Sequence, residues 1–223
     1  RKYEPKLRIP LRGSYRGYDV ITMPPPSSGG TVLLEMLNAL EGFNVTGMGA
    51  GSSRTIHLMA EVMRHAFRDR AELMGDTDFA KVPVSQLILK SYASEFRKRF
   101  DPGKASDSLT LAPRVLPTTE ASETTHFSIV DKDGTAVANT YTLNGGYGSG
   151  VTIEGTGMLM TNELDDFSSK PGIPNAYGLI QGEANAIAPG KRPLPAMTPT
   201  FLLRGGKLFL VIGSPGGPTI INT

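Results

Sequence analysis

The chain has 223 residues, with 23 lysines and arginines against 21 aspartates and glutamates, and it contains no cysteine. The lack of cysteine excludes thiol nucleophiles, disulfides and thiolate metal sites in this chain. No uninterrupted apolar run approaches the roughly 20 residues that a membrane-spanning helix needs, and the scattered basic residues do not form a footprint for nucleic acid. The composition therefore predicts a globular core with a function other than nucleic-acid binding.

The first part of the chain is predicted to be one strand followed by helices. The segment YRGYDVITM, residues 15–23, alternates as a strand does, and PPPSSGG then breaks the pattern. Apolar residues then recur at helical spacing in three segments, at about residues 31–40, 55–73 and 84–100. Ser28 is the candidate cap of the first helix, and Ser52 or Ser53 that of the second.

The buried face of the second predicted helix follows from the same spacing. Ile56, Met59, Met63 and Phe67 recur at intervals of three and four residues, so they are expected on one face. Gly75 follows the helix and is the candidate stop signal. This apolar stripe is interpreted as core and not as a binding site.

The second part of the chain is predicted to consist mainly of strands. Between Asp101 and Glu123, proline, serine, threonine and charged residues dominate without a sustained period, which predicts a mobile connector. A hairpin is expected from Thr124, then a strand over GTGMLMTN (155–162) and a loop over 167–182. The chain closes on FLLRGGKLFLVIG, which predicts a hairpin with a two-residue Gly-Gly turn.

The turn of the first hairpin decides which residue faces Thr124. If residues 132–134 form a three-residue loop with Gly134 in the left-handed region, Thr124 lies opposite Thr142. The two hydroxyls then share a face, with Cβ atoms about 5 Å apart. A two-residue Asp-Gly turn would instead pair Thr124 with Leu143 and direct Thr142 to the other face. We favour the three-residue loop.

A threonine hydroxyl is a poor nucleophile until a base accepts its proton. The chain holds three histidines, and no Ser-His-Asp order stands out. If the peptide bond before Thr124 is broken, the new α-amine, with a pKa of about 8, becomes the base for the hydroxyl beside it. A connector whose end departs after cleavage cannot be locked into the core, which accounts for the loose sequence of 101–123. We therefore expect cleavage between Glu123 and Thr124.

Five segments carry a resemblance to a known family: TTHFSIVDKDGTAVANTYTLN, NELDDFSSKPGIPNAYGL, GKRPLPAMTPT, GSPGG and, upstream, MPPPSSGG. They resemble the γ-glutamyltranspeptidase family of N-terminal-nucleophile hydrolases. The resemblance implies an α+β fold, a four-layer αββα sandwich, and a precursor that cleaves itself before the first threonine of T-T-H. Residues 1–123 would be the C-terminal part of the large subunit, ending in a flexible linker at about 101–123. Residues 124–223 would be the N-terminal part of the small catalytic subunit, with both parts in one αββα domain.

The resemblance also implies a role for particular residues. Thr124 resembles the nucleophile and new N-terminus, and Thr142 the second threonine that hydrogen-bonds it. Gly216 and Gly217 match the oxyanion hole, where backbone N–H groups stabilise the charge on the attacked carbonyl. Tyr177 resembles the gate over the glutamyl pocket. The positions that hold the donor's α-amino group carry acceptors, which suit an ammonium group; they are Asn144, Glu163 and Asp166.

The activity implied by the resemblance is γ-glutamyl transfer. A small-molecule donor such as glutathione would give its γ-glutamyl group to Thr124 as an ester, and water, an amino acid or a peptide would receive it. The implied partner is the other subunit of the same precursor, no cofactor or metal is expected, and a periplasmic or secreted location is expected. The chain starts at Arg1 without methionine and stops at Thr223 just after a glycine-rich turn, so we expect an internal piece of a longer product.

The sequence departs from the family pattern at one substrate position. Where the family commonly has a Ser-Ser pair that contacts the donor's α-carboxylate, this chain has Pro195 and Ala196. The hydroxyl donors are therefore missing. Two alternatives stay open: an acylase of the glutaryl or cephalosporin type, which would explain a weakened carboxylate site but not the intact amino-group site, and a catalytically silent, unprocessed precursor or fragment.

Overall fold

The computed structural model describes residues 4–107, 123–175 and 178–223. The fold is α+β, and its main sheet is antiparallel with the strand order β1-β2-β5-β6. The four strands are β1 (Leu11–Tyr15), β2 (Tyr18–Thr22), β5 (Thr200–Arg204) and β6 (Lys207–Ile212). The central pair β2–β5 joins the two halves of the chain, and the buried hydroxyls of Thr22 and Thr200 lie 2.9 Å apart across it.

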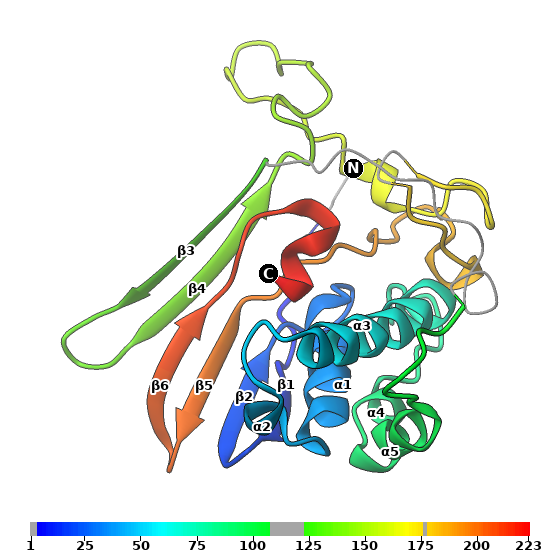
Figure 1. Ribbon diagram of the computed structural model, residues 1–223. Coiled ribbons are helices and arrows are strands. Elements are labelled where there is room, and N and C mark those ends of the chain that lie inside the picture. Colours follow the sequence, from blue (N-terminus) through cyan, green and yellow to red (C-terminus); the bar gives the residue numbers. More distant parts are fainter. Residues whose placement is uncertain (1–3, 108–122, 176–177) are drawn as a thin grey trace.

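Helices cover one side of this sheet, as Figure 1 shows. They are α1 (Gly29–Glu41), α2 (Val45–Met48), α3 (Ser53–Leu73), α4 (Val84–Leu87) and α5 (Lys90–Arg99). Helix α1 contacts both α3 and α5, and its buried side chains Val32 and Met36 pack with Leu58 and Val62 of α3. In the described part of the chain, no helix is long and apolar enough to cross a membrane.

A second, two-stranded sheet lies beside β6 and away from the helices (Figure 1). It is the hairpin of β3 (Thr124–Val130) and β4 (Ala136–Thr142). The two sheets meet at Gly213, which lies against the ring of His126. A Cβ atom at position 213 would lie 2.2 Å from this ring, so only glycine leaves room for it. Three short 3₁₀ helices complete the described structure: η1 (Glu163–Asp166), η2 (Glu183–Asn185) and η3 (Gly217–Asn222).

The register predicted for the β3–β4 hairpin is confirmed. Thr124 pairs with Thr142 along the ladder. Gly134 has a φ of +85°, in the left-handed region that a three-residue loop requires at this position. The Asp131 side chain accepts hydrogen bonds from the N–H groups of Asp133 and Thr135, so the turn is fixed by its own residues. The Gly-Gly hairpin between β5 and β6 is also confirmed.

Three element predictions were wrong. Segment 15–23 is a turn and a strand, because Arg16 and Gly17 have φ values of 49° and 86° and reverse the chain between β1 and β2. The helix predicted over 84–100 is two helices, because Leu89 adopts an extended conformation before α5. Segment 155–162 is not a regular strand: it folds back on residues 149–153 with a few backbone hydrogen bonds and one isolated bridge, between Thr152 and Leu159.

The buried face of α3 agrees only in part with the prediction, since Met63 and Phe67 are partly buried against the core. Ile56 and Met59, which were expected in the core, are 58% and 39% exposed. The buried row of the helix instead contains four residues spaced by four: Leu58, Val62, Ala66 and Arg70. Ser52 caps the helix as predicted, because its hydroxyl accepts a hydrogen bond from the Thr55 N–H.

Ser28 precedes α1 as predicted, but it does not cap the helix with its side chain. Its backbone is already helical, with a φ of −75° and a ψ of −22°, so the hydroxyl does not reach the N–H groups of the first turn. The hydroxyl instead donates to the carbonyl of Pro195 at 2.7 Å. The sequence PPPSSGG is therefore a contact between α1 and a distant segment of the chain.

Candidate active site

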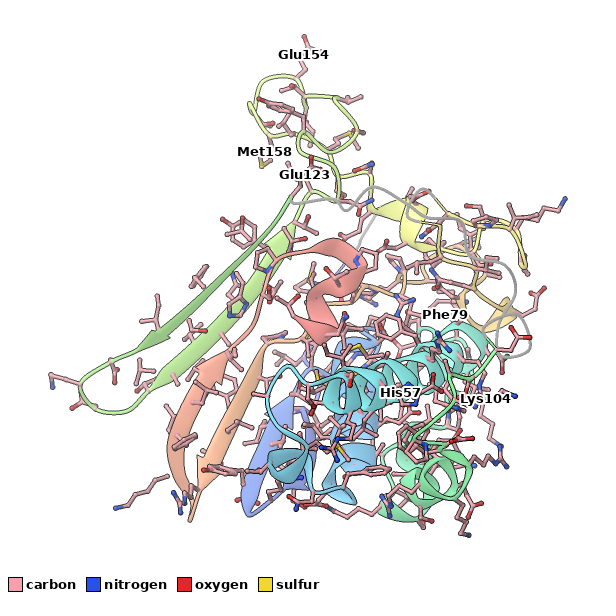
Figure 2. The ribbon with its side chains drawn as sticks, viewed as in Figure 1. His57, Phe79, Lys104, Glu123, Glu154 and Met158 are labelled. Atoms are coloured by element: carbon pink, nitrogen blue, oxygen red, sulfur yellow. The ribbon has the colours of Figure 1, made fainter. Side chains whose placement is uncertain are left out.

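The open end of the β3–β4 hairpin holds the two predicted threonines. Thr142 Oγ donates a hydrogen bond at 3.4 Å to the carbonyl of Glu123, the residue before Thr124. The Asn144 N–H donates to Thr142 Oγ at 2.8 Å. Among the described contacts, no hydrogen bond joins the hydroxyls of Thr124 and Thr142. The Thr142 hydroxyl is instead bonded to the carbonyl of the residue before the predicted nucleophile. Figure 2 shows Glu123 at the base of a projecting loop that carries Glu154 and Met158.

Asn144 is held in a left-handed turn directly after β4. Its φ of 75° is uncommon for a residue other than glycine, and asparagine tolerates this region better than most residues. Asn162 closes the turn, because its N–H donates to the Leu143 carbonyl and its Oδ1 accepts from the Gly145 N–H at 2.8 Å. The turn therefore places Asn144 beside the threonines and Glu163 one residue beyond the closing asparagine.

The two acidic residues predicted to bind an amine lie at the ends of η1. The pKa of Asp166 is raised to about 7, first by burial and then by the negative charge of Glu163, while the positive charge of Arg70 acts in the opposite direction. Burial also raises the pKa of Glu163. Asp166 lines the pocket, and its backbone carbonyl accepts a hydrogen bond from Asn185 Nδ2 at 2.6 Å.

Gly216 and Gly217 form a tight turn before η3. Their φ values of 131° and 52° are both in the region that favours glycine. Neither N–H donates to another residue within the described ranges, whereas the Gly216 carbonyl accepts from Thr219. Two adjacent backbone donors without a described protein partner are the kind of group that stabilises an oxyanion.

One pocket brings these residues together. It is lined by Thr124, Thr142, Asn144, Glu163, Asp166 and Gly217, with Arg70, Leu179, Pro195, Ala196, Met197, Pro218 and Ile220. Gly216 does not line it but precedes Gly217 in the turn, and Tyr177 lies outside the described residues. A larger pocket between α1, α3 and α5 contains none of the predicted site residues. Within the described ranges, no three His, Asp or Glu residues form a group that could hold a metal ion.

Sequence reasoning missed Arg70, which lines this pocket and is 3% exposed. Its neighbour Arg68 is partly exposed and pairs with Asp69, so composition alone does not distinguish the two arginines. The available signal was spacing, since Arg70 continues the row Leu58, Val62, Ala66 by another four residues. A basic residue in line with a buried stripe indicates a buried charge and thus a candidate functional group.

The site residues and the sequence around them match a single family model. The model for gamma-glutamyltranspeptidase covers residues 1–223. The chain belongs to the gamma-glutamyltranspeptidase family. Family membership confirms the resemblance carried by the five segments, but the roles of individual residues stay predictions.

The relatives of this chain include proteins named as hydrolases and acylases. It is 49% identical to the glutathione hydrolase proenzyme of Escherichia coli (strain K12), over 99% of this chain and 38% of that protein. It is 42% identical to the acylase ACY 1 proenzyme of Pseudomonas sp. (strain SE83), over 96% of this chain and 36% of that protein. The chain thus spans well under half the length of these relatives.

A solved structure supports the same fold. The crystal structure of cephalosporin acylase from Bacillus halodurans matches 92% of this chain and 34% of that chain, with a TM-score of 0.70 and 29% identity. The chain therefore shares its α+β architecture with an acylase.

Proposed function

We propose that the protein to which this chain belongs is a self-processing threonine hydrolase and acyltransferase that cleaves γ-glutamyl amide bonds, with glutathione as a representative donor. The observation that carries the proposal is the pocket that joins Thr124, Thr142, two partly buried acids and the turn at Gly217. The hydrolase names of relatives that are 44% to 50% identical to the chain support the same reaction class. A four-layer αββα sandwich shared by two subunits, 1–123 and 124 onward, is part of this proposal.

Self-cleavage begins with the intact Glu123–Thr124 bond. The Thr124 hydroxyl attacks the Glu123 carbonyl carbon, the C–N bond breaks, and the proton of the hydroxyl ends on the released α-amine. The hydrogen bond from Thr142 Oγ to the Glu123 oxygen stabilises the negative charge that develops there, and the Asn144 N–H orients this hydroxyl. Water then hydrolyses the ester and leaves a new carboxylate on Glu123 and a free Thr124.

The released α-amine becomes the base for γ-glutamyl transfer. It accepts the proton of Thr124 Oγ as this oxygen attacks the γ-carbonyl, and the N–H groups of Gly216 and Gly217 receive the oxyanion. The proton passes to the departing amine, which leaves a γ-glutamyl ester on Thr124. Water, an amino acid or a peptide then attacks the ester, with the same α-amine as base.

The acidic side of the pocket reads the donor's α-amino group. An ammonium group has only hydrogen-bond donors, and Asn144 Oδ1 with the carboxylates of Glu163 and Asp166 supplies acceptors and negative charge. Glu163 and Asp166 are partly buried in the pocket, so the attraction is less screened than at the surface. This side of the pocket favours a γ-glutamyl donor over a glutaryl donor, which lacks the amine.

An acylase is the second candidate, and Pro195 and Ala196 favour it. Both residues line the pocket where the family pattern has hydroxyl donors, and proline lacks a backbone N–H as well. The match to an acylase structure is consistent with this reading. A donor without an α-carboxylate would then bind nearly as well as a γ-glutamyl donor.

The proposal is tested by expressing the full-length precursor with Thr124 replaced. Thr124→Ala is expected to remain one uncut polypeptide without γ-glutamyl hydrolysis, and Thr124→Ser to cut more slowly. Gel electrophoresis and N-terminal sequencing measure both outcomes. Thr125→Ala is the matched control, because the adjacent residue has the same side chain but does not line the pocket. Normal cutting of Thr124→Ala would refute the nucleophile assignment.

A further inference from the structure

A buried arginine lies at the wall of the pocket without a carboxylate bound to it. Arg70 is 3% exposed, and within the described residues no Asp or Glu oxygen lies within 4.0 Å of its guanidinium. Burial lowers the pKa of Arg70 to about 10, so the group stays charged at neutral pH. A buried charge without a carboxylate in direct contact is costly to the fold, and its electrostatic partner is Asp166 of the same pocket, so we assign it to the site that it borders.

The guanidinium is bonded to neutral oxygens of two separate segments. Arg70 Nε donates to Ser28 Oγ at 2.8 Å, and Nη2 donates to the Leu194 carbonyl at 3.1 Å. Ser28 in turn donates its hydroxyl to the Pro195 carbonyl at 2.7 Å and its N–H to the same oxygen at 3.0 Å. Arg70 and Ser28, which we call the Arg70–Ser28 clamp, therefore hold two consecutive carbonyls.

The neighbouring residues of PPPSSGG extend this contact. Ser27 Oγ donates to the Met197 carbonyl at 2.7 Å. A Cβ atom at Gly29 would lie 2.1 Å from Thr198 Oγ1, so glycine is required for the approach of the two segments. Segment 194–198 thus lies directly against the start of α1, with its carbonyls facing the helix.

The clamped segment is also a wall of the candidate active site. Pro195, Ala196 and Met197 line the same pocket as Thr124 and Asp166. The clamp acts on their backbone and needs no side-chain hydroxyl at 195 or 196, so it is compatible with the Pro-Ala sequence. A shift of about 1 Å in a substrate-positioning group can cost a hundredfold in rate.

We propose that Arg70 is a positioning residue that, together with Ser28, fixes the pocket wall Leu194–Met197 so that an acyl donor lies at the right distance from Thr124. The inference rests on the proposed function, because it assigns the wall to donor binding. It predicts an effect on donor binding that is separate from self-cleavage, since neither clamp residue hydrogen-bonds the hairpin residues Glu123, Thr124 or Thr142.

The test uses the full-length precursor with Arg70→Met, Arg70→Lys, Ser28→Ala and the double variant Arg70→Met with Ser28→Ala. Arg54→Met is the matched control, because Arg54 is exposed on the same helix and does not line the pocket. Self-cleavage is followed by gel, and kcat and KM for a γ-glutamyl anilide are measured per processed molecule. Thermal unfolding is recorded for every variant.

We expect Arg70→Met to cut normally and to lose about 10- to 100-fold in kcat/KM, mostly through KM, as is typical of losing hydrogen bonds to a charged group. Arg70→Lys keeps the charge and one bond, so it should recover part of the loss. Ser28→Ala should lower kcat/KM about as much as Arg70→Met. The double variant should lose no more in kcat/KM than the more affected single variant, because both residues act on the same pocket wall.

The inference fails if Arg70→Met and Ser28→Ala have the same KM and kcat as Arg54→Met. It also fails if Arg70→Lys and Arg70→Met lower the stability equally and leave KM unchanged. If Arg70→Met does not fold, Ser28→Ala and Arg70→Lys decide by the same measurements. The two proposals fail differently. An unmodified protein that neither cuts nor hydrolyses the anilide contradicts the proposed function, whereas an active one with a silent clamp contradicts this inference alone.

Discussion

The two sides of the pocket are held in the fold in different ways. On the wall side, Ser28 and Leu194 are 0% exposed and Arg70 is 3% exposed, and hydrogen bonds join all three. On the nucleophile side, the hairpin has side chains such as Ile129 and Tyr141 that are 57% and 55% exposed. The wall is therefore part of the packed core, whereas the hairpin that carries Thr124 leaves much of its surface outside that core.

The largest expected effect is a difference in stability between variants on the two sides of the pocket. If the two variants do not differ, the comparison is wrong. Leu194→Ala should lower the free energy of unfolding by about 2 to 5 kcal/mol, because a fully buried leucine leaves a cavity. Ile129→Ala on the exposed hairpin removes a similar aliphatic side chain and should cost less than about 1 kcal/mol. Denaturant unfolding of both variants measures this. Equal losses would show that the hairpin is as firmly packed as the wall.

The next prediction concerns the acidic side of the pocket, where a substitution should weaken donor binding and leave self-cleavage unchanged. Asp166→Asn should lower kcat/KM for a γ-glutamyl anilide by about 10- to 100-fold, mainly through KM, because a hydrogen bond to a charged group is lost. The variant keeps the backbone carbonyl that Asn185 and Gln181 bond, so the fold of η1 is preserved. Steady-state kinetics measures the loss.

The control for this prediction is the adjacent acid. Asp165→Asn should leave KM unchanged, because Asp165 does not line the pocket. Self-cleavage should proceed normally in both variants. An equal rise in KM for Asp165→Asn would assign the effect to overall charge and not to contact with the donor amine.

A smaller effect concerns the wall residues themselves. The unmodified protein, the parent of the double variant below, should discriminate poorly between a γ-glutamyl anilide and its decarboxylated analogue, because Pro195 and Ala196 provide no hydroxyl donors. Pro195→Ser with Ala196→Ser should increase the preference for the γ-glutamyl anilide by about tenfold, equivalent to one net hydrogen bond to a charged group. The ratio of kcat/KM values measures this preference. If the parent already rejects the analogue as strongly as the double variant, other groups hold the carboxylate.

The smallest effect is a shift in pH dependence. Asp166 must be ionised to receive an ammonium group, and its pKa of about 7 means that donor binding weakens as pH falls below that value. The negative charge of Glu163 contributes to this raised pKa, so Glu163→Gln should move the acid limb of kcat/KM to lower pH. A pH profile of both proteins measures the shift. A limb that stays in place or moves to higher pH would contradict the assignment of the limb to Asp166.

Local signals made parts of the fold predictable. The hairpin register followed from Gly134 because its turn is fixed by neighbouring residues. The helix predicted over 84–100 failed because its apolar spacing continues across Leu89, where the backbone is extended. Segment 155–162 failed because it pairs only irregularly, with the neighbouring residues 149–153, and does not form a regular strand. Turn chemistry acts over a few residues, whereas pairing depends on what the rest of the chain supplies.

The candidate site was predicted by resemblance, and its geometry required the structure. Six of the proposed residues meet in one pocket although they come from four separate segments. Arg70 was missed because its role depends on Ser28 and Leu194, which lie 42 and 124 residues away in the sequence. The hydrogen bond from Thr142 to the Glu123 carbonyl was likewise not foreseen, since it depends on the intact peptide bond and on side-chain direction.

The most direct test of the account is to locate the acyl group during turnover. The full-length enzyme is quenched in acid while it hydrolyses a γ-glutamyl anilide, and the fragments are digested and analysed by mass spectrometry. The account predicts a fragment whose N-terminus is Thr124 and which carries a γ-glutamyl group as an ester on that side chain. A γ-glutamyl group on another residue, or turnover by a chain in which the Glu123–Thr124 bond is intact, would contradict it.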